Sequence, residues 1–202
     1  MTKQRVGIFG GTFSPPHLGH VKAAMEFIND VSLDKLFVIP TFIPPHKIAS
    51  KSISPRQRIE MCRLAFSDVE KAEISDIEIS RGGKSFTYLT LKELASDNRE
   101  LFLLVGTDMF LTLAEWKNPE IIFSLCTVCY IRREDDERLS KKISEMKNYY
   151  ESHFKARIIE ISSEVIEISS TEIREKLASD DKPEEFLPEQ VLEYIRKRGL
   201  YS

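Results

Sequence analysis

The chain has 202 residues, of which 42% are hydrophobic and 30% are charged, and its formal net charge is −3. This length and composition predict a single globular domain over residues 1–202 with a buried core. The small negative charge disfavours broad binding of nucleic acid, and no apolar run reaches the length of a membrane span.

Short apolar runs alternate along the chain with segments of helical periodicity. The apolar runs predict strands over Arg5–Phe9, Lys35–Ile39, Ala72–Ile77, Leu101–Val105, Thr127–Ile131 and Arg157–Ile161. The periodic segments predict helices over Leu18–Asn29, Pro55–Phe66, Thr87–Ser96, Phe110–Glu115, Asp136–Glu151, Ser170–Ala178 and Pro188–Lys197. This alternation implies an α/β fold, a Rossmann-like doubly wound parallel sheet with helices on both faces. The helical segment at about 169–202 is expected to pack on that domain.

In such a sheet, ligands bind at the carboxyl ends of the strands, near the point where the strand order reverses. Three segments directly follow predicted strands: the glycine-rich segment after Phe9, Phe42–Lys47 and Gly106-Thr107-Asp108. We therefore expect these segments to lie together at one edge of the sheet.

The segment from Gly7 to His20 carries the strongest functional signal. We expect Gly10 and Gly11 to allow a tight turn and a close approach of a ligand. The helix that begins at Leu18 offers free N–H groups and a positive dipole end, which suit a phosphate. His17 and His20 would share one face of that helix. The segment predicts a nucleotide triphosphate site with catalytic histidines; the alternative is an ordinary helix cap and a surface residue.

Three other patterns do not meet the requirements of the motifs that they resemble. Glycines at 7, 10 and 11 do not form the dinucleotide pattern G-x-G-x-x-G, and no acid follows the second strand, which disfavours a nicotinamide dehydrogenase. Gly83-Lys84-Ser85 lacks the first glycine of a P-loop, because Glu78 stands there. Cys126 and Cys129 would face opposite sides of a strand, which indicates buried structural thiols.

A second anion site is predicted near residue 170. Ser169, Ser170 and Thr171 are good residues for the start of a helix, and their hydroxyls and N–H groups can bind an anion. Arg174, one turn later, can donate two hydrogen bonds to a phosphate. The alternative is an ordinary capped helix with Arg174 on its exposed face.

These two segments resemble the two signatures of the nucleotidylyltransferase superfamily. Gly10–Phe13 followed by His17–His20 resembles its HxGH signature, and residues 168–174, ISSTEIR, resemble its ISSTxIR signature. In detail the chain resembles the bacterial nicotinate-nucleotide adenylyltransferases. The segments that carry this likeness are Pro44–Lys47, Ser54–Met61, Ser85–Leu91 and Gly106–Asp108, with Trp116 following. Ser14 and Leu89 depart from the pattern, since aspartate is usual at both positions, and Ser14 changes the hydrogen bonding expected in the loop.

The resemblance implies adenylyl transfer from ATP to nicotinate mononucleotide, which gives nicotinate adenine dinucleotide and pyrophosphate in NAD biosynthesis. It implies that His17, His20 and Arg174 are catalytic. It assigns ATP binding to Gly10, Gly11, Thr12, Phe13, His17, His20, Gly106, Asp108, Ser169, Ser170, Thr171 and Arg174. It assigns binding of nicotinate mononucleotide to Thr12, Lys47, Thr87 and Trp116.

Each of the less specific residues also has an ordinary interpretation. Trp116 could pack in the core, Thr87 could simply begin a helix, and Asp108 could cap the predicted helix Phe110–Glu115. Lys47 could be a solvated loop residue. For Arg56 and Arg58 the default interpretation is surface charge.

The resemblance implies Mg²⁺ as the cofactor, held mainly by the substrate phosphates rather than by a protein metal site. With no signal-peptide core after Met1, we expect a cytoplasmic enzyme with no nucleic-acid or membrane partner. The oligomeric state stays open. The rival functions are phosphopantetheine adenylyltransferase, a cytidylyltransferase for an alcohol phosphate, use of nicotinamide mononucleotide, a sensor without catalysis and a fragment of a class I aminoacyl-tRNA synthetase.

Overall fold

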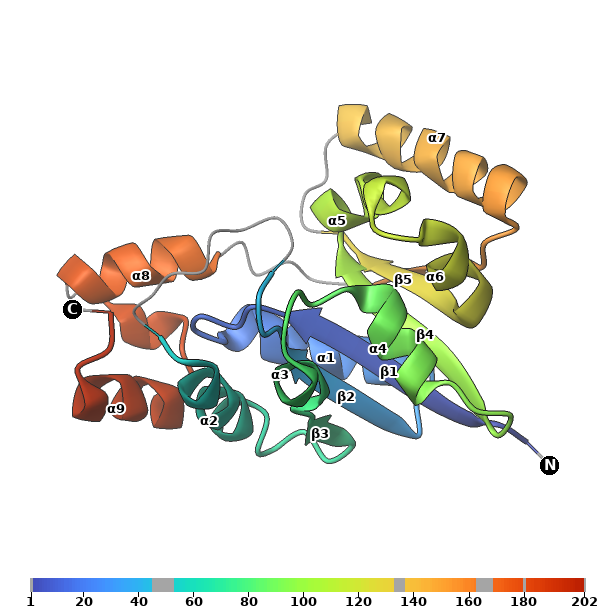
Figure 1. Ribbon diagram of the computed structural model, residues 1–202. Coiled ribbons are helices and arrows are strands. Elements are labelled where there is room, and N and C mark those ends of the chain that lie inside the picture. The colour runs from blue at the N-terminus through green and yellow to red at the C-terminus, as the bar shows by residue number, and fades with distance from the viewer. Residues whose placement is uncertain (1, 45–52, 133–136, 163–168, 180, 202) are drawn as a thin grey trace.

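The computed structural model describes residues 2–44, 53–132, 137–162, 169–179 and 181–201. Within these residues, six parallel strands form one sheet in the order β3-β2-β1-β4-β5-β6. The strands are β1 (Gln4–Gly11), β2 (Lys35–Pro40), β3 (Ala72–Ile74), β4 (Arg99–Gly106), β5 (Cys126–Ile131) and β6 (Ile158–Ile161). All six predicted strands and the doubly wound Rossmann-like fold are confirmed (Figure 1).

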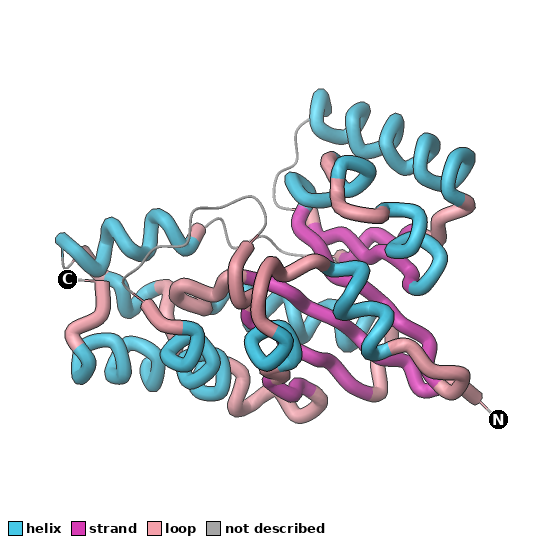
Figure 2. Tube along the Cα trace, in the orientation of Figure 1, coloured by secondary structure: helices cyan, strands magenta, loops and turns pink. Residues whose placement is uncertain are grey.

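Helices cover both faces of the sheet, with the strands running through the middle of the molecule (Figure 2). One core contains residues of α1 (Leu18–Asp30), α2 (Pro55–Ala65), α8 (Ser170–Ser179) and α9 (Glu189–Arg198). The opposite core contains residues of α4 (Thr87–Leu94), α5 (Thr107–Leu111), α6 (Pro119–Leu125) and α7 (Glu137–Phe154). Parallel strands buried on both faces explain why the strand sequences are almost continuously apolar.

The structure corrects the predicted elements at four places. The third strand ends at Ile74, and Ile77–Arg81 forms the short helix α3 instead of continuing the strand. The predicted helix Phe110–Glu115 is two elements, α5 and the 3₁₀-helix η1 (Leu113–Glu115). The sequence analysis also missed α6 and the 3₁₀-helix η2 (Pro183–Glu185). All these elements have seven residues or fewer, which is too short for a clear helical period.

The two buried cysteines of β5 lie in opposite cores, as their spacing predicts. Cys126 belongs to the α4–α7 core and Cys129 to the core shared by α1 and α9. Burial raises the pKa of the Cys129 thiol to about 12, so it stays a neutral packing residue. In the described ranges, no helix is long and apolar enough to cross a membrane.

The strand order reverses beside β1, which pairs with β2 on one side and with β4 on the other. A Cβ atom at Gly7 would lie 2.4 Å from Leu33 Cδ1 and 2.9 Å from Phe27 Cε1. Glycine at this position therefore lets α1 pack closely on β1. This packing places the N-terminus of α1 at the carboxyl end of β1, where the strand order reverses.

Candidate nucleotide-binding site

The loop between β1 and α1 turns after the glycines rather than at them. Gly10 and Gly11 belong to β1, and the left-handed residue of the turn is Phe13, with φ of 48°. The expected tight turn at the two glycines is therefore wrong by two residues. The Phe13 ring is buried, with its centroid 5.0 Å from the ring of His20 and 6.2 Å from that of Phe66. A Cβ atom at Gly10 would meet nothing within 4 Å, so this side of the strand end is open.

The two histidines lie together at the start of α1. His17 is the N-cap residue and is 3% exposed, and the centroids of the His17 and His20 rings are 3.7 Å apart. The backbone N–H of His17 donates to His20 Nδ1 at 3.2 Å. Because Nδ1 accepts this bond, a neutral His20 ring carries its proton on Nε2.

The second motif docks directly on this loop, although the two are far apart in the chain. Arg174 Nη1 donates to the Ser14 carbonyl at 2.8 Å, across 160 residues, and Arg174 Nη2 donates to Thr171 Oγ1 at 2.9 Å. Ser170 Oγ donates to the Pro15 carbonyl at 3.1 Å. The structure thus brings His17, His20, Ser170, Thr171 and Arg174 to one loop.

The start of α8 has the hydrogen bonds of a capped helix. Ser169 donates through its N–H and Oγ to Glu172 Oε2, and the Glu172 N–H donates back to Ser169 Oγ. These bonds from Ser169 lower the pKa of the Glu172 carboxyl. The predicted helix start at Ser169 and Ser170 is confirmed, and Arg174 is partly buried rather than fully exposed. Ile168 of the motif and Lys47 lie outside the described residues.

Arg58 is a loop anchor that the sequence analysis assigned to the surface. Its side chain is 5% exposed, and its guanidinium donates to the carbonyls of Thr12 at 2.8 Å and Thr41 at 2.5 Å. Burial lowers the pKa of Arg58. The default interpretation as surface charge is wrong for Arg58 and correct for the exposed Arg56. The helical spacing of Arg58 to the buried Met61 and Cys62 is the signal that could have revealed it.

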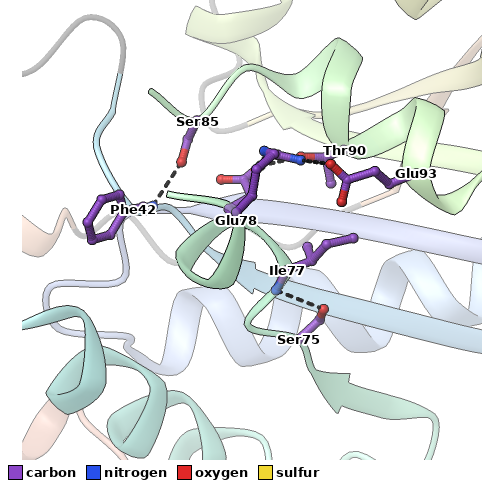
Figure 3. Close-up of polar contacts among 8 residues, drawn as sticks. Phe42, Ser75, Ile77, Glu78, Ser85, Thr90 and Glu93 are labelled. Carbon is purple, nitrogen blue, oxygen red and sulfur yellow. Dashed lines mark hydrogen bonds and ion pairs between the residues drawn. The ribbon is translucent and has the colours of Figure 1, made fainter. Parts of the chain in front are cut away.

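A second group of polar contacts ties the start of α4 to the end of β2 (Figure 3). The Phe42 N–H donates to Ser85 Oγ at 2.8 Å, and the Ser85 N–H donates to the Ile43 carbonyl at 2.9 Å. Thr87, the first residue of α4, is partly buried two positions further on. Trp116, also partly buried, packs against the core of the same face, so its ordinary interpretation as a packing residue holds at least in part.

Beside α4 lies a polar network whose members Glu78 and Thr90 are buried and which could not be identified as a unit from the sequence (Figure 3). Thr90 Oγ1 donates to Glu78 Oε1 at 2.7 Å, and Arg81 donates to Thr90 Oγ1 at 2.9 Å and to Glu93 Oε1 at 2.8 Å. Glu78 is 5% exposed. The network joins α3 to α4, and Gly82, with φ of 71°, makes the turn after α3. Rejection of a P-loop here is consistent with this turn.

The segment after β4 has a different cap from the one expected. Gly106 is the N-cap of α5, Thr107 is its first residue and Asp108 lies exposed in its first turn. Asp108 is therefore not the cap of a helix at Phe110. Thr107 Oγ1 donates to the Ile131 carbonyl at 3.0 Å and links the ends of β4 and β5. Asp108 lies at the carboxyl edge of the sheet, where the first loop also lies.

The described residues include no group of three or more His, Cys, Asp or Glu side chains that could hold a metal ion. The side chains around the first loop are instead imidazoles, hydroxyls and guanidinium groups. This donor set suits an anion better than a bare cation.

Comparison with known proteins identifies relatives over the full length of the chain. The Cytidylyltransferase-like family matches residues 8–176. A protein of Clostridium botulinum named "Probable nicotinate-nucleotide adenylyltransferase" is 34% identical over 98% of both chains. One of the same name from Desulfatibacillum aliphaticivorans is 37% identical over 98% of this chain and 99% of its own. The fold matches Plasmodium falciparum nicotinic acid mononucleotide adenylyltransferase complexed with NaAD, with a TM-score of 0.73, 20% identity and coverage of 98% and 97%.

We expect Arg58→Met to lower the free energy of unfolding by about 2 kcal/mol or more, because two buried carbonyls lose a charged donor. Arg56→Met is the matched control, since Arg56 is exposed on the same helix and should change stability by about 0.5 kcal/mol or less. Urea denaturation of both variants measures the difference. Equal effects of the two substitutions would contradict the anchoring role of Arg58.

Proposed function

The chain belongs to the Cytidylyltransferase-like family and, within it, to the nicotinate-nucleotide adenylyltransferases, and we propose that the loop after β1 forms its ATP site with the N-termini of α1 and α8. The enzyme transfers the adenylyl group of ATP to nicotinate mononucleotide in NAD biosynthesis. One observation carries the assignment of the site. Arg174 and Ser170 of α8 hydrogen-bond the loop that leads into His17 and His20.

The reaction needs alignment and charge stabilisation more than proton transfer. An ionised phosphate oxygen of nicotinate mononucleotide attacks the α-phosphorus of ATP and forms a new P–O bond. The bond from the α-phosphorus to the oxygen that bridges to the β-phosphate breaks, and pyrophosphate leaves with those electrons. Because the nucleophile is already an anion, no general base is required. A site made of hydrogen-bond donors and positive charge is therefore sufficient.

We assign the α-phosphate to His20, a residue of the first turn of α1 at the end of this loop. His17 lies beside it, and the N-terminus of α1 adds its positive dipole end. Ser170, Thr171 and Arg174 would hold the β- and γ-phosphates and stabilise the departing pyrophosphate. Two N–H groups of Arg174 bond the protein, and the guanidinium has further donors for a phosphate.

Along the rest of the loop, Gly10, Gly11, Thr12 and Phe13 would lie against ATP. The open side of Gly10 supports this placement. Gly106 and Asp108 would approach the adenosine from the end of β4, and the exposure of Asp108 is compatible with that role. Ser169 would contribute to ATP binding by capping the start of α8.

Mg²⁺ enters this scheme as part of the substrate, Mg-ATP. The phosphates and water would supply its oxygen ligands, as is common for this ion. Support comes from the imidazole, hydroxyl and guanidinium groups around the loop, which suit the phosphates of Mg-ATP.

Nicotinate mononucleotide is proposed to bind near Thr87 and Trp116, together with Thr12 and Lys47. Thr87 opens α4, where a free backbone N–H and a hydroxyl can meet the carboxylate of the pyridine ring. Trp116 is only partly buried, so part of its indole stays available for stacking on that ring. We also propose a cytoplasmic location, which the three unpaired thiols support.

The assignment is tested by mixing the protein with Mg-ATP and either nicotinate or nicotinamide mononucleotide, and measuring dinucleotide and pyrophosphate. We expect product with the nicotinate form and at least about tenfold less with the amide, because a site built for a carboxylate loses an ionic partner. Replacement of ATP by CTP is the control for the nucleotide. Preference for the amide or for CTP would overturn the substrate assignment.

His20→Ala should lower kcat by about 10²–10³-fold, the usual cost of losing one preorganised donor to a developing charge. His153→Ala, an exposed histidine of α7, is the control and should leave kcat unchanged. Circular dichroism should show both variants folded. A loss of less than about tenfold for His20→Ala would contradict its proposed role.

Trp116→Ala should raise KM for nicotinate mononucleotide by about tenfold or more and change KM for ATP much less, because stacking involves the pyridine ring only. Trp116→Phe keeps an aromatic face and should lie between the wild type and the alanine variant. Initial-rate kinetics with each substrate varied in turn separate the two constants. Equal changes in both would mean that Trp116 acts only in packing.

A further inference from the structure

Ser14 is held through its side chain as well as through its backbone. Its hydroxyl lies 3.0 Å from the hydroxyl of Tyr201, a residue 187 positions further along the chain, and either oxygen can donate. Its carbonyl accepts from Arg174 Nη1 at 2.8 Å. One residue of the loop is therefore bonded to two distant segments at once.

The end of α9 determines where Tyr201 lies. The helix stops at Gly199, with φ of 57°, and the Leu200 N–H donates back to the Ile195 carbonyl at 3.1 Å. Leu200 is 9% exposed and belongs to the core that α1 and α2 also share. The residue before Tyr201 is thus anchored by packing, and this packing holds the phenol of Tyr201 beside Ser14.

Unusual backbone conformations occur on both sides of the contact. Phe13, next to Ser14, has φ of 48°, and Tyr201 has φ of 67°. Bulky residues rarely adopt a left-handed conformation, and they keep it only where the surrounding structure demands it. Two such aromatic residues meeting at Ser14 indicate that the contact is specified rather than incidental.

Burial keeps the Tyr201 phenol neutral. Burial raises the pKa of Tyr201 to about 12, and the hydrogen bond from Ser14 and the positive charges of Arg174 and Arg58 act in the opposite direction. Since deprotonation occurs only near pH 12, the hydroxyl pair persists over the working range of the enzyme. The phenol is therefore suited to a fixed structural bond and not to exchanging a proton with substrate.

We propose that Tyr201 is a positioning residue for the ATP half of the site. Through the Ser14 hydroxyl it holds the Ser14 carbonyl against Arg174. It thereby positions both the Arg174 guanidinium and the loop to bind the phosphates of ATP. The inference rests on the proposed function of this loop as the ATP site. It also gives Ser14 a defined hydrogen-bonding role.

The test compares Tyr201→Phe, Ser14→Ala and the double variant by steady-state kinetics and by titration with a non-hydrolysable ATP analogue. Each single variant should lower kcat/KM for ATP and weaken binding of the analogue by about 3- to 10-fold, the size expected for one neutral hydrogen bond. KM for nicotinate mononucleotide should change by about twofold or less. The double variant should be no worse than the poorer single variant, because both changes break the same bond.

Tyr194→Phe is the matched control. Tyr194 is a partly buried tyrosine of α9, and its ring lies 5.8 Å from the Arg198 guanidinium rather than at the loop. Its loss of one hydroxyl should leave both ATP constants unchanged. Thermal melting of all the variants measures any purely structural cost of removing a hydroxyl.

Three outcomes would overturn the proposal. The first is multiplicative effects of the two single variants on analogue binding. The second is a lower melting temperature for Tyr201→Phe with unchanged ATP constants. The third is equal changes in the constants for ATP and for nicotinate mononucleotide. Because binding of the analogue is measured without turnover, the result stands even if the acceptor proves to be a different compound.

Discussion

Side chains from distant helices donate hydrogen bonds to the backbone carbonyls of the loop between β1 and α1, and the rest of the site depends on these bonds. Buried carbonyls that find no partner are costly, so they must be met by donors from elsewhere. Arg58 of α2 meets Thr12, while Arg174 and Ser170 of α8 meet Ser14 and Pro15. The loop therefore takes its conformation only when α2 and α8 are packed on it.

The side chains that stabilise the loop are therefore also those proposed to bind the phosphates of ATP. The guanidinium that satisfies the Ser14 carbonyl also carries the positive charge that a triphosphate needs, and the same loop leads into the paired histidines. A reaction that depends on alignment rather than proton transfer gains most from such fixed donors, because they do not reorganise when charge moves. The two segments proposed to bind ATP are thus hydrogen-bonded to each other, although about 150 residues separate them in the chain.

On the opposite face of the sheet, polar contacts between elements also hold a helix in place. The Glu78–Thr90–Arg81 network holds α4 against α3, and the contact of Phe42 with Ser85 holds the start of α4 near the end of β2. The network pairs Glu78 and Arg81 of α3 with Thr90 of α4, and the other contact joins Phe42 to Ser85 across 43 residues, so no local pattern marks them as a group. In the sequence, Glu78 is notable only because it breaks a P-loop pattern, and Arg58 is expected at the surface. Both are more than nine-tenths buried.

By itself the sequence determined the order of strands and long helices along the chain and the parallel character of the sheet. It also determined where glycines, histidines and capping residues concentrate. Apolar periodicity and helix caps depend on neighbours within a few residues, and so they can be recognised in short segments of the sequence. Only the tertiary structure decided that the turn is made at Phe13, that Arg58 is buried and that Tyr201 lies against Ser14. These features depend on partners up to 187 residues away, and their energy exists only once the helices have packed.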